Sequence, residues 1–354
     1  MVCDFGCPMP NQRDIAKRLG VSQVAISLAL RGDLSISASL RKRVRAAAKR
    51  LGYRPNPYVS TLMSHIRAGR KPSEKGVLAL LVDVFSRRDW HKHESYRVYF
   101  RGVSRRSAEL GFRLESFFLT EPNMNAEKVD RILYARGIHG VILAPPYLGN
   151  RRLAMKWSRY ACVGTGYGWE QQQFDRVAHD HAHNVVLAFQ QLSGLGYARI
   201  GMSIPSFYVK GRGARWLDGF LACQYRLPKE RRVPLFVGSR EENSFADFQR
   251  WHAQHRPDAV LTLYGHEMHW LQALGLRVPR DIGLACVIRP AGSTLAGIND
   301  RYEQIGAATV ELVASKIAFN QYGIPPYPKL ILIEGHWVAG KSIRRKGRAA
   351  DLQF

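Results

Sequence analysis

The sequence predicts a small all-α head that contains a helix-turn-helix, joined to a two-lobed α/β body with parallel sheets. Near the start, two short amphipathic segments flank a single glycine. The first 75 residues contain 15 Lys and Arg against 4 Asp and Glu, so positive charge is concentrated there. From residue 77 onwards, short apolar runs alternate with amphipathic stretches, which is the pattern of parallel sheets covered by helices.

The head is expected to begin with two short helices, residues 14–19 and 23–30. Gly20 permits the tight turn between them, and Ser22 is a suitable N-cap for the second helix. A helix-turn-helix of this kind places its second helix in the major groove of DNA. The apolar side chains that should face the core are Ile15, Ala16 and Leu19 on the first helix and Ile26, Ala29 and Leu30 on the second.

A third helix, residues 38–51, is predicted between the cap residue Ser37 and the stop residue Gly52. Its inner face is Leu40, Val44, Ala47, Ala48 and Leu51. Its outer face is basic and comprises Arg41, Lys42, Arg43, Arg45, Lys49 and Arg50. This basic face is either a solvated helix surface or, for one or two residues, a contact to the DNA backbone.

The segments DIAKRLGVSQVAISLALRG and SISASLRKRVRAAAKRLGYRPN resemble the DNA-binding domain of the lactose-repressor (LacI/GalR) family over residues 14–63. The resemblance implies that Gln23 and Val24 contact base edges, where Gln suits adenine and Val suits a thymine methyl. Leu28 stands where many relatives carry a polar side chain that contacts bases. Leucine has no polar group, so its contact there is limited to apolar groups. The residues at phosphate-contacting places are Ser22, Ser27, Arg31 and Ser37.

Residues 56–63 resemble the hinge helix of the same family, which folds on operator DNA in relatives. Leu62 is at the place of the leucine that enters the minor groove, and Asn56 and Val59 belong to the same predicted hinge. The alternative for Leu62 is an ordinary linker leucine. The predicted domains are an N-terminal extension (1–10), the helix-turn-helix domain (11–55), hinge and linker (56–75), the two-lobed body (76–340) and a basic tail (341–354).

The body resembles the family's effector domain, which is similar to periplasmic sugar-binding proteins, in four stretches: 136–146, 195–202, 274–287 and 295–317. The predicted strands are 77–84, 112–119, 141–144, 160–163, 199–204, 233–237, 259–263 and 282–287. The predicted helices include 96–110, 128–136 and 183–195. In such sheets, ligands bind beyond the carboxyl ends of the strands.

The predicted cleft departs from relatives that bind neutral sugars. Trp216, preceded by Arg215, stands where those relatives carry an arginine. Tyr264 and His266 replace an Asn-Asp pair, and Arg289 stands near the place of an aspartate. Phe85 and Tyr167 complete the predicted effector site. Basic and aromatic groups favour an acidic or phosphorylated sugar, whereas the alternative is a pocket that binds nothing.

The remaining features bear on function classes. A net charge of +25 favours a polyanionic partner. The N-terminal segment lacks a signal-peptide pattern and no apolar run reaches 18 residues, so we expect a cytoplasmic, nucleoid-associated protein. We expect no metal, since Asp180 suits a helix cap better than a ligand between His179 and His181. No cofactor motif or nucleophile constellation is found, so an enzyme is not expected.

The expected protein is therefore a homodimeric transcriptional regulator, most often a repressor in this family, whose operator affinity is controlled by a small-molecule effector of sugar type. The helices predicted at 99–110 and 302–319 are candidates for the dimer interface. The alternative is a ligand-independent or architectural DNA-binding protein that uses its body only to dimerise.

Overall fold

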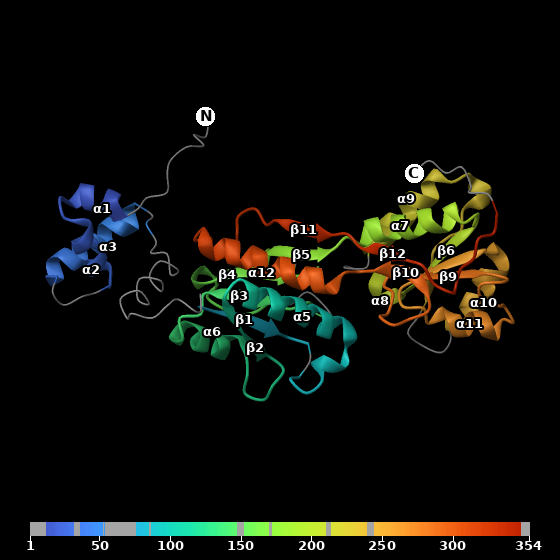
Figure 1. Cartoon of the computed structure of the whole chain (residues 1–354), viewed down its shortest axis with the longest axis horizontal. Coiled ribbons are helices and arrows are strands. Elements are labelled where there is room, and N and C mark those ends of the chain that lie inside the picture. The colour runs from blue at the N-terminus through green and yellow to red at the C-terminus, as the bar shows by residue number, and fades with distance from the viewer. Residues whose placement is uncertain are drawn as a thin grey trace. The chain divides into compact units, whose positions relative to one another are not determined.

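The computed structural model describes residues 12–31, 36–51, 53, 76–84, 86–146, 152–169, 172–209, 214–238 and 244–347 (Figure 1). The chain divides into two compact units, one comprising residues 1–75 with 317–320 and the other the rest. The predicted hinge residues Asn56, Val59 and Leu62 lie outside the described residues, as do Phe85 and the side chain of Arg31.

The head consists of α1 (Gln12–Leu19), α2 (Gln23–Arg31) and α3 (Ala38–Arg50). The turn before α2 uses Gly20, whose φ is +64°. The hydroxyl oxygen of Ser22 accepts a bond from the amide of Ala25 at 3.2 Å, and Ser37 caps α3 by accepting from the amide of Leu40 at 3.3 Å. The predicted helices, both caps and the glycine turn are thus confirmed. The buried core residues are Ile15, Ala16, Ile26, Ala29, Val44, Ala47 and Ala48.

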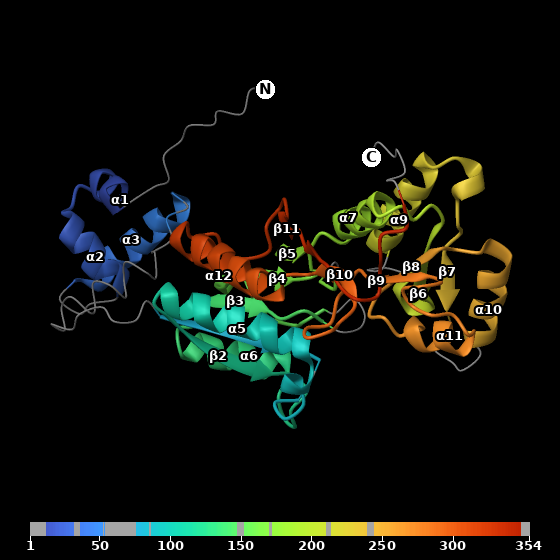
Figure 2. The same cartoon turned by 45° about the vertical axis from the view of Figure 1, so that its right-hand side comes forward.

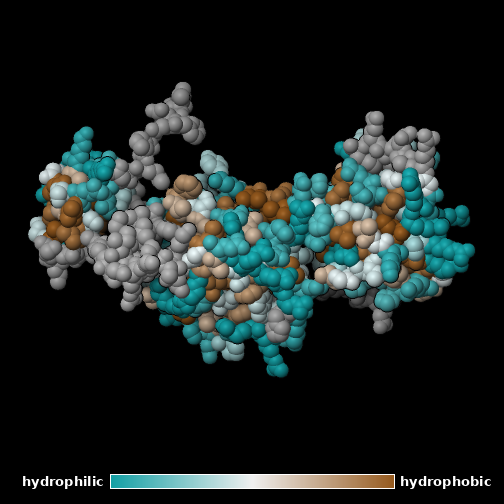
Figure 3. Space-filling model, in the orientation of Figure 1, coloured by the Kyte–Doolittle hydropathy of each residue, from teal (hydrophilic) through white to brown (hydrophobic). Residues whose placement is uncertain are grey.

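The first lobe is a parallel sheet with the strand order β11-β5-β4-β3-β1-β2. Its strands are β1 (Gly76–Val82), β2 (Phe112–Phe118), β3 (Gly140–Leu143), β4 (Ala161–Thr165), β5 (Asp175–His179) and β11 (Leu330–Ile333). The helices α5 (Glu94–Glu109), α6 (Ala126–Ala135) and α12 (Tyr302–Ala318) belong to this lobe. The strand β11 is an edge whose Ile331 and Leu332 remain exposed, and Figure 3 shows apolar surface over it.

The second lobe is a sheet with the order β12-β10-β9-β8-β6-β7, in which β12 alone runs antiparallel to its neighbour. Its strands are β6 (Ile200–Pro205), β7 (Phe236–Gly238), β8 (Ala259–Thr262), β9 (Gly283–Cys286), β10 (Ala296–Asn299) and β12 (His336–Val338). The helices α7 (His181–Gly194) and α9 (Ala214–Arg226) cover one face, and α10 (Ser244–His255) and α11 (Glu267–Ala273) cover the other (Figures 1 and 2). Two parallel-sheet lobes confirm the predicted fold class.

The chain passes between the lobes three times: after β5, after β10 and after β11. The segment after β5 leads into α7, which Asp180 caps by accepting from the amide of His183 at 3.0 Å. The expected capping role of Asp180 is thus confirmed. These crossovers bring residues that are distant in sequence to the junction of the lobes.

The two helices expected to form a dimer interface, α5 and α12, pack against each other within the chain. Gly102 and Gly306 lie at their crossing: a Cβ at Gly102 would overlap the backbone of Glu303, and one at Gly306 would overlap that of Tyr99. Arg105 and Glu303 form an ion pair across the crossing at 2.6 Å. One face of each helix is therefore used internally, and any contact with a second copy must use another face.

The described part of the predicted basic tail belongs to the second lobe. The buried Ser342 donates to the carbonyl of Leu284 at 2.6 Å, and the amide of Lys346 donates to the carbonyl of Leu195 at 2.8 Å. The boundary expected at residue 341 is therefore wrong, because residues 341–347 supply hydrogen bonds to the lobe. Residues 348–354 lie outside the described residues. Within the described chain, no helix is long and apolar enough to cross a membrane.

Candidate functional site

The outward face of α2 carries the side chains predicted to read bases. Ile26 and Ala29 are fully buried on the inner side of this helix, which turns Gln23 and Val24 outward. Val24 is 68% exposed although it is apolar, and Leu28 is partly buried. Val24 can therefore contact a partner that is placed against this face of α2.

The polar groups around α2 are compatible with DNA contact. The Nε of Arg13 donates a long 3.4 Å bond to the Oε1 of Gln23, and this bond lies at the surface. The hydroxyls of Ser22 and Ser37 accept capping bonds from backbone amides, and Ser27 is partly buried. A serine hydroxyl that accepts one bond can still donate its own proton to a phosphate oxygen. Capping and phosphate contact are therefore compatible at Ser22. At Ser37 they are compatible when Ser39 is the donor in the 3.1 Å bond between the two hydroxyls.

A second candidate site lies where the two lobes meet, beyond the carboxyl ends of β4, β6 and β8. The guanidinium of Arg215 lies 4.5 Å from the ring centroid of Tyr167. The rings of Tyr208 and Trp216 are 5.4 Å apart, and the hydroxyls of Tyr208 and Tyr264 are hydrogen bonded at 3.2 Å. Four predicted residues, Tyr167, Arg215, Trp216 and Tyr264, thus belong to one aromatic cluster.

Two histidines that were considered only as metal ligands are part of this cluster. The ring of His181 lies 3.9 Å from that of Trp216 and 5.4 Å from that of Tyr167. His179 stacks on His181 at 5.5 Å and meets the edge of Tyr302 at 4.5 Å. In the sequence these histidines are marked only by the His-Asp-His motif at the end of a strand. That motif does not show that their spatial neighbours come from distant parts of the chain.

The acid of the cluster is Asp300, which follows β10 and is buried. Its Oδ1 accepts from the Nδ2 of Asn184 at 2.7 Å, and its backbone oxygen lies 3.0 Å from the Nδ1 of His179. Burial raises the pKa of Asp300 to about 8 and lowers the pKa of His179 to about 4. Burial also lowers the pKa of His181, with smaller contributions from His179 and Arg215. At neutral pH this acid and both histidines are therefore uncharged.

Three buried polar atoms of the cluster have no hydrogen-bond partner among the described residues: the Nε1 of Trp216, the Nδ1 of His181 and the Oδ2 of Asp300. Buried polar atoms are nearly always paired in folded proteins, so such a group of exceptions needs an explanation. A polar molecule with several donors and acceptors, bound among these aromatic rings, would supply the partners.

Of the three remaining predicted effector residues, Phe85 lies outside the described residues, and His266 and Arg289 lie elsewhere than in the cluster. His266 is exposed at the start of α11, with its ring 6.2 Å from that of Tyr264. Arg289 donates from its Nε to the carbonyl of Leu295 at 2.7 Å and from its Nη2 to the carbonyl of Ser293. The guanidinium of Arg289 therefore holds its own loop, which weakens the argument that it attracts an anionic ligand.

The chain is similar to known bacterial regulatory proteins. Residues 12–56 match the family of bacterial regulatory proteins described as the lacI family. The ribose operon repressor of Escherichia coli (strain K12) is 22% identical over 332 residues, which cover 87% of this chain and 93% of that protein. The matched family comprises regulatory proteins, and this relative is a repressor; neither is an enzyme. This agrees with the expectation that the chain is not an enzyme.

Two solved structures share the fold. The complex of the transcriptional regulator CelR with cellobiose has a TM-score of 0.55 at 20% identity and covers 94% of this chain and 99% of its own. The lac repressor dimer bound to operator and the anti-inducer ONPF has a TM-score of 0.55 at 17% identity and covers 95% of this chain and 100% of its own. The head-and-two-lobe architecture is thus that of solved regulators.

Proposed function

We propose that this DNA-binding transcriptional regulator, whose head matches the lacI family and whose fold is that of solved regulators, is a homodimeric repressor controlled by a small polar effector. The observation that carries the DNA-reading part is the outward face of α2, where Gln23 and Val24 stand exposed on a helix fixed by its N-cap Ser22 and its buried core residues. The lac repressor, which shares this fold, is a dimer bound to operator. Two heads are needed because a two-fold operator presents two half-sites.

We propose that Gln23 reads an adenine, Val24 contacts a thymine methyl, and Leu28 adds only apolar contact. Ser22, Ser27, Arg31 and Ser37 would fix the register through phosphates. The hinge with Asn56, Val59 and Leu62 would complete the grip in the minor groove. This division separates residues that choose sequence from residues that only add affinity.

We further propose that the effector binds in the aromatic cluster between the lobes. The supporting observations are the unpartnered polar atoms of Trp216, His181 and Asp300, and the ring faces around them. CelR, which shares the fold, was solved with cellobiose. Because Asp300 and both histidines are uncharged at neutral pH and Arg289 is engaged by carbonyls, we expect a neutral, hydroxyl-rich sugar rather than an acidic one. Binding would bias the relative position of the lobes, and thereby the two hinges of the dimer.

The DNA-reading proposal is tested by selecting bound sequences from a random duplex pool with the full-length protein. We expect a two-fold symmetric consensus. Gln23→Ala should relax the choice of base at one position per half-site, at a cost of about 1–3 kcal/mol for the preferred base. Ser22→Ala serves as the control, because loss of a phosphate contact weakens all sequences alike. A consensus that is unchanged by Gln23→Ala would refute the assigned role.

The effector proposal is tested by thermal unfolding of the protein with neutral sugars, uronic acids and sugar phosphates. Neutral sugars should raise the melting temperature, because a ligand that binds only the folded state stabilises it by mass action. Arg215→Gln should leave this effect in place, since Arg215 is exposed and stacks on Tyr167 rather than on the unpartnered atoms. If sugar phosphates alone stabilise the protein and Arg215→Gln abolishes this, the ligand is acidic. If no ligand acts, the body is a ligand-independent dimerisation scaffold.

A further inference from the structure

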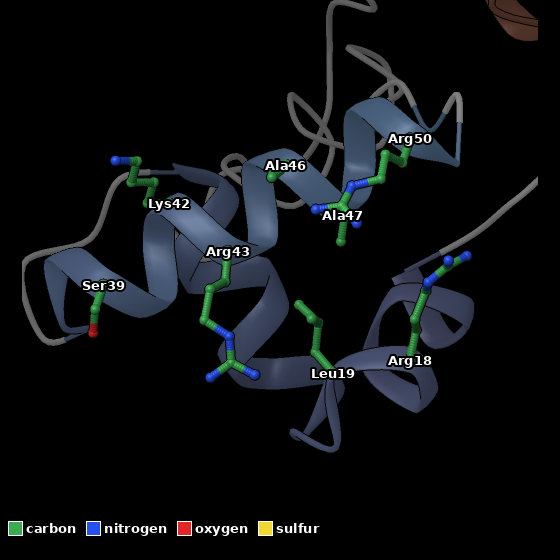
Figure 4. Close-up of a pocket in the computed structure, with 8 residues that line it drawn as sticks. All are labelled: Arg18, Leu19, Ser39, Lys42, Arg43, Ala46, Ala47 and Arg50. Carbon is green, nitrogen blue, oxygen red and sulfur yellow. The ribbon is translucent and has the colours of Figure 1, made fainter.

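A groove of about 540 Å³ lies on the head between the end of α1 and α3. Leu19 and Ala47 form its floor, and four long basic side chains stand on its rim (Figure 4). Arg18 comes from α1, whereas Lys42, Arg43 and Arg50 come from α3. The hollow exists because α3 presents small alanines beside Leu19, so that the two helices leave space between them.

The rim cations are exposed and, among the described residues, none of the four forms an ion pair with a carboxylate. Residues 12–31 and 36–51 together hold ten Lys and Arg against a single Asp. Within the segment of α2, residues 22–31, Arg31 is the one cation. The positive charge of the head is therefore concentrated on α1 and α3 rather than on the helix that is proposed to read bases.

The groove and the outward face of α2 lie on different sides of the head. α2 contributes no side chain to the groove, and its Ile26 and Ala29 point into the core shared with α1 and α3. In a three-helix unit, the furrow between two helices opens away from the third. A duplex seated on α2 therefore leaves most of this basic surface in solvent.

We propose that the groove between α1 and α3 is a second DNA site, which holds the phosphate backbone of another duplex without sequence preference. The inference rests on the proposed function only in that α2 holds the first duplex. Arginine forms paired hydrogen bonds with phosphate oxygens, and cations that neutralise phosphates gain affinity by releasing counterions. The rise from Lys42 to Arg50 is about 12 Å along the helix, comparable to the axial rise of three to four phosphates of one strand.

The small side chains on the floor of the groove suit DNA because they let its phosphate backbone approach α3 closely. The cations on the rim can then contact the phosphates from both sides. With both sites filled, one head joins two duplexes, so that the protein bridges DNA in addition to occupying an operator. An acidic protein segment is negatively charged, as DNA is, and is therefore the alternative occupant of the groove. DNA is the better candidate because a protein seated on an operator is surrounded by other duplex.

The test uses full-length protein and an immobilised duplex that carries the consensus obtained from the sequence selection. A fluorescent duplex of unrelated sequence is then added, and its capture is measured. The variant Lys42→Glu/Arg50→Glu reverses two rim charges. The matched control is Arg45→Glu/Lys49→Glu, which makes the same change on exposed positions of the same helix outside the groove. Far-ultraviolet circular dichroism verifies that both variants are folded.

We expect wild type and Arg45→Glu/Lys49→Glu to capture the second duplex, and Lys42→Glu/Arg50→Glu to lose capture by at least about tenfold. All three should still bind the immobilised consensus. Equal loss in both variants, or loss in neither, overturns the proposal. If soluble polyglutamate binds wild type but not Lys42→Glu/Arg50→Glu while bridging is unchanged, the groove takes an acidic protein and the DNA proposal is wrong. Failure to obtain any consensus would instead refute the proposed function.

Discussion

Replacing Lys316 by methionine should lower the free energy of unfolding by about 3–5 kcal/mol. The Nζ of Lys316 on α12 lies 2.5 Å from the Oδ2 of Asp175 on β5, and each side chain is 3% exposed. The other carboxylate oxygen of Asp175 accepts from the amide of Lys329 at 2.8 Å. Methionine fills the volume of lysine but leaves the buried carboxylate without its counter-charge, which is the reason for the large cost. Denaturant unfolding followed by tryptophan fluorescence measures the effect.

Two controls separate this cause from a general effect of losing a lysine. Lys92→Met removes the partner of Asp89, but that pair is exposed and screened by solvent, so its loss should lower the free energy of unfolding far less than the loss of Lys316. Adding Asp175→Asn to Lys316→Met removes the uncompensated charge and keeps an acceptor for Lys329, so part of the loss should be recovered. A cost for Lys316→Met no larger than that for Lys92→Met would contradict this account.

The fold was most predictable where the signals are local. The head helices followed from apolar spacing and from the cap residues Ser22 and Ser37, all of which act within a few residues. The strands β5, β10, β11 and β12 were missed, and all four lie at or near the crossovers. β5 (DRVAH) carries polar residues, so it has no apolar run to mark it. Its position depends on pairing with β4 and β11, which lie far apart in the sequence.

The interlobe site was predicted in part for a similar reason. Tyr167, Arg215, Trp216 and Tyr264 stand beyond strands or at helix starts, and the structure brings them together. Arg289 was assigned to the cleft because it follows β9, but the direction of its side chain is set by the carbonyls of Ser293 and Leu295. The sequence does not show which partner a long side chain will choose, because that depends on how the following loop folds.

Asp300 was missed as a member of the site because its neighbours His179 and Asn184 come from another crossover more than a hundred residues earlier. A carboxyl group next to two histidines would also be expected to form charged pairs in water. Burial reverses that expectation, since it penalises the charged forms of Asp300, His179 and His181. The neutral state of these three groups is therefore a property of packing rather than of composition.

Replacing Asp300 by asparagine should increasingly stabilise the protein, relative to wild type, as the pH rises. In wild type, burial raises the pKa of Asp300 to about 8, whereas an unfolded Asp has a pKa near 4. Between these values the unfolded chain has lost its proton and the folded chain has kept it, so stability falls as pH rises. Asparagine retains an acceptor for Asn184 and does not titrate. Its advantage should grow by about 1.4 kcal/mol per pH unit, or roughly 4 kcal/mol between pH 5 and 8.

The measurement is the difference in unfolding free energy between wild type and Asp300→Asn at a series of pH values. Taking the difference cancels the shared contribution of His179, whose lowered pKa of about 4 acts in the opposite direction and costs stability as pH falls below about 6.5. Asp281→Asn is the matched control, because Arg277 lowers the pKa of Asp281 to about 2 and this exposed carboxylate does not titrate in the same range. Its difference from wild type should be constant with pH. A constant difference for Asp300→Asn as well would mean that Asp300 is ionised in the folded protein, and that the site between the lobes carries a negative charge.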